Sequence, residues 1–174
     1  VFGLNAASTG LNERSAGNAG IAFDSVMVFP SDKVGLMPGS NYMCFKLLFE
    51  TPSGKLLGAQ AIGTGDVTKR VDAIAALISA KSDIQDLFAY EHCYAPLYST
   101  AKDVVHMAGL VAENVLSGRL KQVHVSQVRK LVEDGAYILD VREEDEFAQS
   151  HVKGAHNLPT SVLRQHLEEI PRDV

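Results

Sequence analysis

Few side chains in this sequence can form a covalent bond or transfer a proton near neutral pH. Cys44 and Cys93 are its two cysteines, and their wide separation excludes a C-x-x-C redox pair and a structural zinc site. We expect both to serve as small apolar side chains. The tripeptide Tyr94-Ala95-Pro96 follows directly after Cys93. The phenol of Tyr94 can donate a hydrogen bond or a proton to a developing anion. The alternative is a tyrosine ring that packs in an interface.

Other candidate residues favour structural roles. We expect Tyr90 and Tyr98 to pack and His92 to lie on the surface. Gly63-Thr64-Gly65 precedes a predicted helix, but it lacks the third glycine of the dinucleotide-binding motif G-x-G-x-x-G. We therefore interpret this segment as a turn between a strand and a helix. The sequence predicts no cofactor-binding residue and no metal ligand in this chain.

The composition indicates a globular protein and excludes several classes of function. Of the 174 residues, 46% are hydrophobic and 21% are charged, which is not the composition of a disordered chain. The net charge of −5 is spread without a basic stripe, which argues against nucleic-acid binding. No apolar run approaches the ~20 residues that cross a bilayer, so we expect no membrane contact. The two distant cysteines argue against a disulfide framework and favour the cytoplasm.

The elements that position these residues form two units, residues 1–119 and residues 120–174. In the first unit, strands precede helices, and a turn with Pro and Gly predicts an antiparallel hairpin. Asn12 and Asp66 are the predicted N-caps of two helices. This order predicts an α+β fold, an antiparallel sheet with flanking helices. We expect strands at 1–4, 23–30, 42–50 and 56–63, and helices at 11–19, 66–81, 82–89 and 102–116.

Short strands alternate with helices in the second unit, which predicts a parallel sheet. About 55 residues hold too few strands to complete such a sheet, so we expect a truncated α/β unit that folds poorly alone. The first unit opens inside a predicted strand and without a methionine, so we expect the chain to be cut from a longer protein. In the second unit we expect strands at 136–141 and 155–158, and helices at 126–133, 143–148 and 161–169.

Two segments of the first unit, Gly54–Gly65 and Tyr94–Asp103, carry a resemblance to a known family. Residues 1–119 resemble the C-terminal dimerisation domain of the flavin-dependent pyridine nucleotide–disulfide oxidoreductases, in the coenzyme A-disulfide reductase and NADH oxidase branch. The resemblance implies that apolar faces of two amphipathic helices form a two-fold homodimer interface. Periodicity alone is equally compatible with helices that close a monomeric core.

The same resemblance implies a role for Tyr94. In the coenzyme A-disulfide reductase branch, a tyrosine in a Y-A-P context is lent to the partner subunit's active site, where it protonates the departing thiolate. The parent enzyme would use FAD and NAD(P)H, bound outside this chain, to reduce a low-molecular-weight disulfide such as coenzyme A disulfide or persulfide. A second tyrosine of the branch, in a Y-Y-P-G segment, is replaced here by Leu36-Met37-Pro38-Gly39. This departure weakens the assignment of coenzyme A disulfide as the substrate.

The second unit is similar to the first half of a rhodanese domain. The resemblance is carried by Leu139-Asp140-Val141-Arg142, Glu146-Phe147, His151, Gly154-Ala155, Asn157 and Pro159. We expect structural roles for these residues, with Asp140 and Arg142 paired at the end of a strand. No cysteine follows Cys93, so sulfur transfer by this unit is not expected.

The two resemblances together predict a C-terminal fragment of a disulfide reductase that is inactive alone. The alternatives are a non-enzymatic dimerisation or binding module and a fragment of an NADH oxidase.

Overall fold

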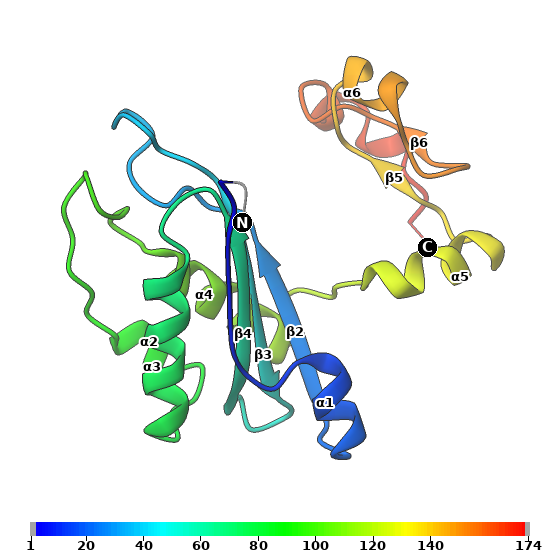
Figure 1. The fold of residues 1–174 in the computed structure, drawn as a ribbon. Coiled ribbons are helices and arrows are strands. Elements are labelled where there is room, and N and C mark those ends of the chain that lie inside the picture. The colour runs from blue at the N-terminus through cyan, green and yellow to red at the C-terminus, as the bar shows by residue number, and fades with distance from the viewer. Residues whose placement is uncertain (1–2, 173–174) are drawn as a thin grey trace. The chain divides into compact units, whose positions relative to one another are not determined.

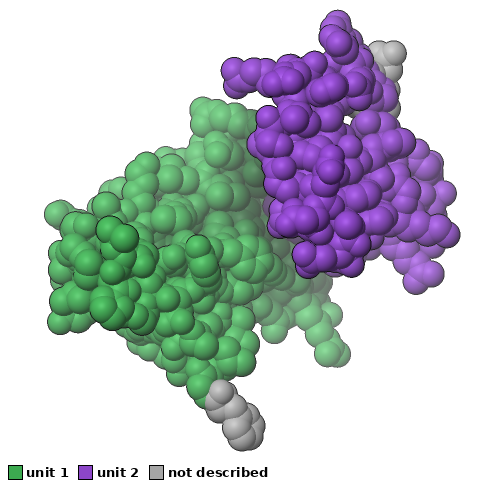
Figure 2. All heavy atoms as spheres, turned by 90° about the horizontal axis from the view of Figure 1, so that it is seen from above, with its two compact units in different colours: residues 1–121 green, residues 122–174 purple. Residues whose placement is uncertain are grey.

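A computed structural model describes residues 3–172 of the chain. The chain divides into two compact units, residues 1–121 and residues 122–174, which Figure 2 colours separately. The centre of the first unit is a four-stranded antiparallel sheet in the order β1-β4-β3-β2 (Figure 1). Its strands are β1 (Asn5–Gly10), β2 (Phe23–Val28), β3 (Met43–Glu50) and β4 (Leu56–Gly63). This sheet confirms the predicted α+β class.

The predicted hairpin is formed by β3 and β4. Residues 51–55 connect the two strands, and Gly54 adopts a φ of +74° in this turn. Glycine reaches this left-handed backbone region without the steric cost that a Cβ atom imposes. The Gly54 N–H donates to the Glu50 carbonyl at 2.9 Å, which closes the turn. The local turn chemistry therefore sets the pairing of the two central strands.

Two predictions at the edges of elements are wrong. The strand predicted at 1–4 falls partly on Val1 and Phe2, which lie outside the described residues, and its other two residues, Gly3 and Leu4, precede the first observed strand. The segment Asn5–Gly10, where the sequence predicted no strand, forms β1 because it pairs along its length with β4. The N-cap of the helix after β4 is Val67, not Asp66.

Two helices cover one face of the sheet. Helix α2 (Thr68–Ser79) packs against β1 and β4, and α4 (Val104–Leu116) packs against β2 and β3. A short helix, α3 (Asp86–Ala89), lies beside α4. None of the helices in the described part of the chain is long and apolar enough to span a bilayer. The core beneath the helices contains Val26, Phe45, Leu47, Phe49, Ala59, Val71, Ile74, Val104, Val105, Ala108 and Ala112.

The opposite face of the sheet is covered only in part. Helix α1 (Glu13–Asn18) packs there, and the side-chain oxygen of its N-cap, Asn12, accepts from the Ser15 N–H at 2.8 Å, as predicted. Beyond α1, Met27 and Ile62 are 50% and 47% exposed. By contrast, α2 exposes none of its large apolar side chains, and α4 exposes one, Leu110, at 40%. Most of the exposed large apolar side chains of the first unit therefore lie on this sheet face and on loops, and the two helices present less apolar surface than predicted.

The second unit is a small α/β segment with little buried surface. Its elements are α5 (Val125–Glu133), β5 (Leu139–Asp140), α6 (Glu144–Gln149) and β6 (His156–Asn157). The two strands pair in parallel, as predicted. The predicted helix at 161–169 is wrong, because two 3-10 helices, η1 (Leu163–Gln165) and η2 (Leu167–Glu169), occupy this region. Pro159 is the one residue that is buried in the described part of this unit.

Candidate functional site

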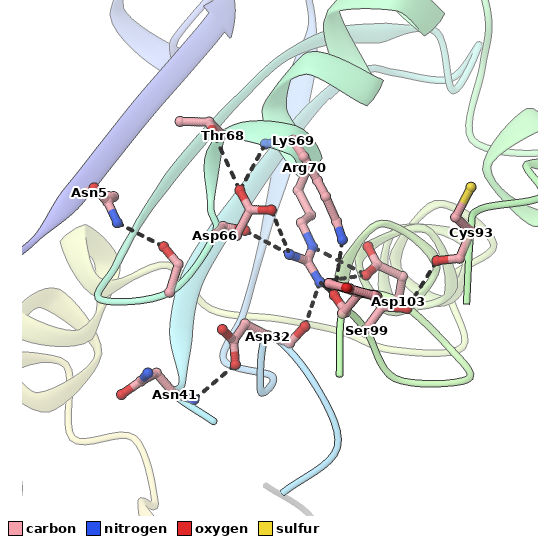
Figure 3. A network of polar contacts seen from close by, with 12 residues as sticks. Asn5, Asp32, Asn41, Asp66, Thr68, Lys69, Arg70, Cys93, Ser99 and Asp103 are labelled. Carbon is pink, nitrogen blue, oxygen red and sulfur yellow. Dashed lines mark hydrogen bonds and ion pairs between the residues drawn. The ribbon is translucent and has the colours of Figure 1, made fainter. Parts of the chain in front are cut away.

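Tyr94 lies in the segment between α3 and α4 and is 53% exposed. Hydrogen bonds within this segment hold it as a closed loop. The backbone N–H groups of Tyr98 and Ser99 donate to the Ala95 carbonyl at 2.8 and 3.1 Å. The buried Ser99 hydroxyl donates to the Cys93 carbonyl at 3.3 Å (Figure 3). The loop therefore has a defined shape and leaves the Tyr94 ring at the surface.

Arg70 of α2 is buried beneath this loop, with 1% of its surface exposed. Its Nε and Nη2 donate to the Asp103 carboxylate at 3.2 and 2.9 Å (Figure 3). Asp103 also caps α4, since its side chain accepts from the Val105 N–H. Nη1 of Arg70 donates to the Asp66 carbonyl at 2.7 Å. These partners compensate for the cost of burying a charge.

The same guanidinium reaches two surface segments. Its Nη2 donates to the Tyr98 carbonyl at 3.3 Å, and the neighbouring Lys69 Nζ donates to the same oxygen at 2.9 Å. Nη2 also donates to the Asp32 carbonyl, and the Asp32 carboxylate accepts from the Asn41 N–H at 2.9 Å (Figure 3). One side chain therefore joins the segment 31–41 to the loop that carries Tyr94.

Sequence reasoning missed Arg70, although a signal was present. Val67, Val71 and Ile74 form an apolar stripe along this helix, and Arg70 lies at the edge of that stripe, next to Ile74 on the helical wheel. A cation beside an apolar stripe is buried only where partners compensate its charge. The sequence does not reveal which partners these are.

A pocket beside Tyr94 is lined by aromatic rings that include Tyr90, His92 and His106. The His92 and His106 rings lie 4.9 Å apart, measured between their centroids. His92 Nε2 lies 3.2 Å from the Thr100 carbonyl, so the prediction of a surface histidine is wrong: the ring is half-buried against His106. Tyr90 packs against the core, as predicted, and burial raises the pKa of its phenol.

His106 has one hydrogen-bonded and one unpaired ring nitrogen. Its Nε2 lies 2.7 Å from the Tyr90 carbonyl, which can only accept, so Nε2 is assigned the proton. In the part of the chain that the structure describes, His106 Nδ1 is the one buried side-chain nitrogen or oxygen without a hydrogen-bond partner. The imidazole thus anchors the start of the Tyr94 loop through a single bond.

The two cysteines are free thiols in different surroundings. Cys44 is half-buried on β3, and burial raises the pKa of its thiol, partly opposed by the charge of Lys46. Cys93 is exposed next to Tyr94. The prediction that Cys93 packs as a small apolar side chain is therefore wrong for this chain. Tyr98 is also exposed, at 67%, and does not pack as predicted. Both residues lie on the outer surface of the same loop.

The glycine turn before α2 does not fit a nucleotide phosphate. A Cβ atom on Gly65 would lie 2.2 Å from Asp32 Oδ2, so a carboxylate occupies the space in front of the turn. The Asn5 side-chain amide donates to the Gly65 carbonyl at 2.9 Å. A carboxylate at this position repels an anion. Within residues 3–172, no cluster of three or more potential metal ligands is present.

In the second unit, Asp140 and Arg142 pair at the end of β5, as predicted. Arg142 Nε and Nη2 donate to the Asp140 carboxylate at 3.0 and 2.6 Å, and this hydrogen bonding lowers the pKa of Asp140. The Asn157 amide donates to the Asp140 and Arg142 carbonyls at 3.0 and 2.9 Å. These contacts hold the turn between β5 and α6 against β6.

Residues 1–105 match the family model of the pyridine nucleotide-disulphide oxidoreductase dimerisation domain. The chain belongs to this family. Residues 124–173 match the model of the rhodanese-like domain. The order of the two matches is the one that the sequence predicted, and the family consists of FAD- and NAD(P)H-dependent disulfide reductases.

Solved structures of two relatives resemble nearly the whole chain. Reduced Bacillus anthracis CoADR-RHD is 41% identical with a TM-score of 0.95, and a NAD-dependent persulfide reductase from A. fulgidus is 36% identical with a TM-score of 0.86. Each comparison covers 99% of this chain and 31% of the relative. Coenzyme A disulfide reductase of Staphylococcus epidermidis is 30% identical over 112 residues, which cover 64% of this chain and 25% of that protein. The chain thus spans between a quarter and a third of these relatives.

Proposed function

We propose that this chain supplies the dimer interface and one active-site tyrosine of an FAD- and NAD(P)H-dependent disulfide reductase. Residues 1–119 act as the dimerisation domain of a homodimer, and residues 120–174 form a partial rhodanese-like unit. We place the FAD and NAD(P)H sites in parts of the parent protein outside this chain; the turn before α2, with the Asp32 carboxylate in front of it, does not fit a nucleotide phosphate. Two free cysteines, one of them exposed, are compatible with the reducing cytoplasm.

Tyr94 is the residue that we assign to catalysis in the partner's site. When a thiolate attacks one sulfur of a disulfide, the S–S bond breaks and its electron pair moves to the departing sulfur. The Tyr94 O–H donates a hydrogen bond to that sulfur and so stabilises the developing negative charge; the phenol then gives its proton to the sulfur, which completes the thiol product, and solvent water returns a proton to the phenolate. The attacking thiolate belongs to the redox cysteine outside this chain.

One observation carries this proposal. In a chain of this family, Tyr94 stands exposed on a loop whose backbone is closed by hydrogen bonds and anchored to a buried arginine. An exposed tyrosine beside exposed Leu97 and Tyr98 is the surface expected of a residue that another subunit covers.

The substrate class follows from the relatives' names and from the segment 31–41. One relative is named for persulfide and another for coenzyme A disulfide. Leu36 of this chain is 89% exposed where the branch often carries a phenol, so this position offers an apolar side chain in place of a second phenol. We therefore assign a low-molecular-weight disulfide or persulfide, with Tyr94 as the one phenol supplied by this chain.

The test compares Tyr94→Phe with Tyr98→Phe in the full-length flavoprotein. Both substitutions remove one hydroxyl from an exposed tyrosine of the same loop, but only the first removes the proposed donor. We expect Tyr94→Phe to lower kcat for NADH-dependent disulfide reduction about 10²-fold, with normal FAD content. Tyr98→Phe should retain the wild-type rate. Equal rates for wild type and Tyr94→Phe would assign Tyr94 to packing.

Two measurements on the chain itself separate the proposal from its alternatives. Sedimentation velocity at micromolar concentration should show a dimer, and the chain with NADH and coenzyme A disulfide should show no turnover. A monomer would contradict the interface assignment. If the full-length protein reduces the disulfide with NADH and consumes no oxygen above the background without enzyme, an NADH oxidase is excluded.

A further inference from the structure

We propose that Arg70 is the positioning residue for Tyr94, fixing the Tyr94 loop relative to the segment 31–41. This inference rests on the proposed role of Tyr94 as the phenol that faces the departing sulfur. Arg70 has no contact with the substrate in this scheme. It acts through the backbone that it holds.

A short series of hydrogen bonds leads from Arg70 to Tyr94. Arg70 Nη2 holds the Tyr98 carbonyl together with the exposed Lys69 Nζ, and the next residue, Ser99, holds the carbonyls of Cys93 and Ala95. These two residues are the immediate neighbours of Tyr94 in the chain. A shift of the Tyr98 carbonyl therefore moves the backbone on both sides of the tyrosine.

The geometry of the arginine matters as well as its charge. Its planar group presents five N–H donors, and in this structure they reach the Asp103 carboxylate and the backbone carbonyls of Asp66, Tyr98 and Asp32. A lysine has a compact ammonium with three donors and cannot span these acceptors at once. Because Arg70 is 1% exposed, its rotamer is held by packing and its bonds are little screened by water.

Because Arg70 donates to the Asp32 carbonyl as well as to the Tyr98 carbonyl, it bridges two surface segments by hydrogen bonds. The segment 31–41 and the Tyr94 loop extend toward the same end of the first unit (Figure 1). Leu36 on one segment and Tyr94 on the other are both exposed. Misplacing a reacting group by about 1 Å costs about 10²-fold in rate. Loss of these Arg70 hydrogen bonds should therefore lower the rate of the chemical step more than it weakens substrate binding.

The experiment is a double-mutant cycle in the full-length flavoprotein. Arg70→Lys keeps the charge opposite Asp103, and Ser99→Ala removes the hydroxyl bond to the Cys93 carbonyl without touching the buried ion pair or the backbone bond of residue 99 to the Ala95 carbonyl. Each is combined with Tyr94→Phe, and Arg119→Lys is the control at an exposed arginine. We expect each single variant to lower kcat for disulfide reduction at least about tenfold, while KM changes less than about threefold and FAD content stays normal. In the Tyr94→Phe background, neither substitution should lower kcat further.

Hydrogen exchange supplies a second readout, because the amides of residues 93–99 should exchange faster in Arg70→Lys and at the wild-type rate in Arg119→Lys. If Arg70→Lys or Ser99→Ala lowers kcat by the same factor in the Tyr94→Phe background as in the wild type, the inference is wrong. It is also wrong if these substitutions leave kcat unchanged in the wild-type background. If Arg70→Lys does not fold, Ser99→Ala decides by the same cycle. If Tyr94→Phe alone keeps the wild-type rate, the proposed function fails first, and that single variant identifies the failure.

Discussion

Replacing Asp103 with asparagine tests whether the buried ion pair with Arg70 holds the first unit together. Asparagine has nearly the same shape and keeps an oxygen that can cap α4, so the helix cap is retained. The substitution removes the negative charge 2.9 Å from Arg70 Nη2. The guanidinium then stays buried with carbonyl partners and one distant, half-exposed carboxylate, Asp66 Oδ2 at 3.9 Å.

The magnitude follows from the burial of the pair. Arg70 and Asp103 side chains are 1% and 5% exposed, so solvent screens their interaction little. Breaking such a pair by removing one partner costs about 3–5 kcal/mol. We take the lower end, about 3 kcal/mol, because the carbonyls still accept from Arg70. For a unit of this size the loss corresponds to a fall in Tm of roughly 10 °C.

Thermal unfolding of the 174-residue chain followed by circular dichroism measures this effect. Asp66→Asn is the matched control: it removes the other carboxylate near Arg70, which is half exposed and should contribute less than about 1 kcal/mol. We expect Asp103→Asn to unfold roughly 10 °C below wild type and Asp66→Asn to lie close to wild type. If the two variants have the same Tm, the buried pair does not stabilise the fold in the way argued.

Two further predictions concern thiol reactivity and the second unit. Iodoacetamide at pH 8 should alkylate exposed Cys93 faster than Cys44, because burial raises the pKa of the Cys44 thiol and leaves less thiolate at this pH; equal rates by peptide mass spectrometry would contradict this. Residues 122–174 alone should melt without a cooperative transition, since Pro159 is the one buried residue in the described part of the unit. A sharp calorimetric peak for this segment would show that the unit has a core that its burial pattern does not reveal.

Features set by neighbours in the sequence were predictable. The hairpin of β3 and β4 follows from alternating apolar residues and a turn with Pro and Gly. The Asn12 cap follows from its bond to Ser15, three residues away. The pairing of Asp140 with Arg142 spans two residues. Each of these interactions closes within one turn, so side-chain type and spacing nearly determine it.

Features set by distant contacts were not predictable. β1 consists of small residues, most of them polar, that indicate no strand, and it forms because β4 offers a free edge for pairing. His92 was expected at the surface and is instead held against His106 of α4. The sequence alone indicates neither that β1 pairs with β4 nor that His92 packs against His106.

By itself the sequence determined the family, the order of the two units and the candidate phenol, because these depend on local periodicity and on short motifs such as Tyr94-Ala95-Pro96. Only the tertiary structure decided how that phenol is held. Arg70 meets Tyr98, Asp103 and Asp32, which lie 28, 33 and 38 residues away in the chain. Contacts over such separations exist only once the sheet and helices have packed, since packing brings these groups together and excludes the water that would otherwise solvate them.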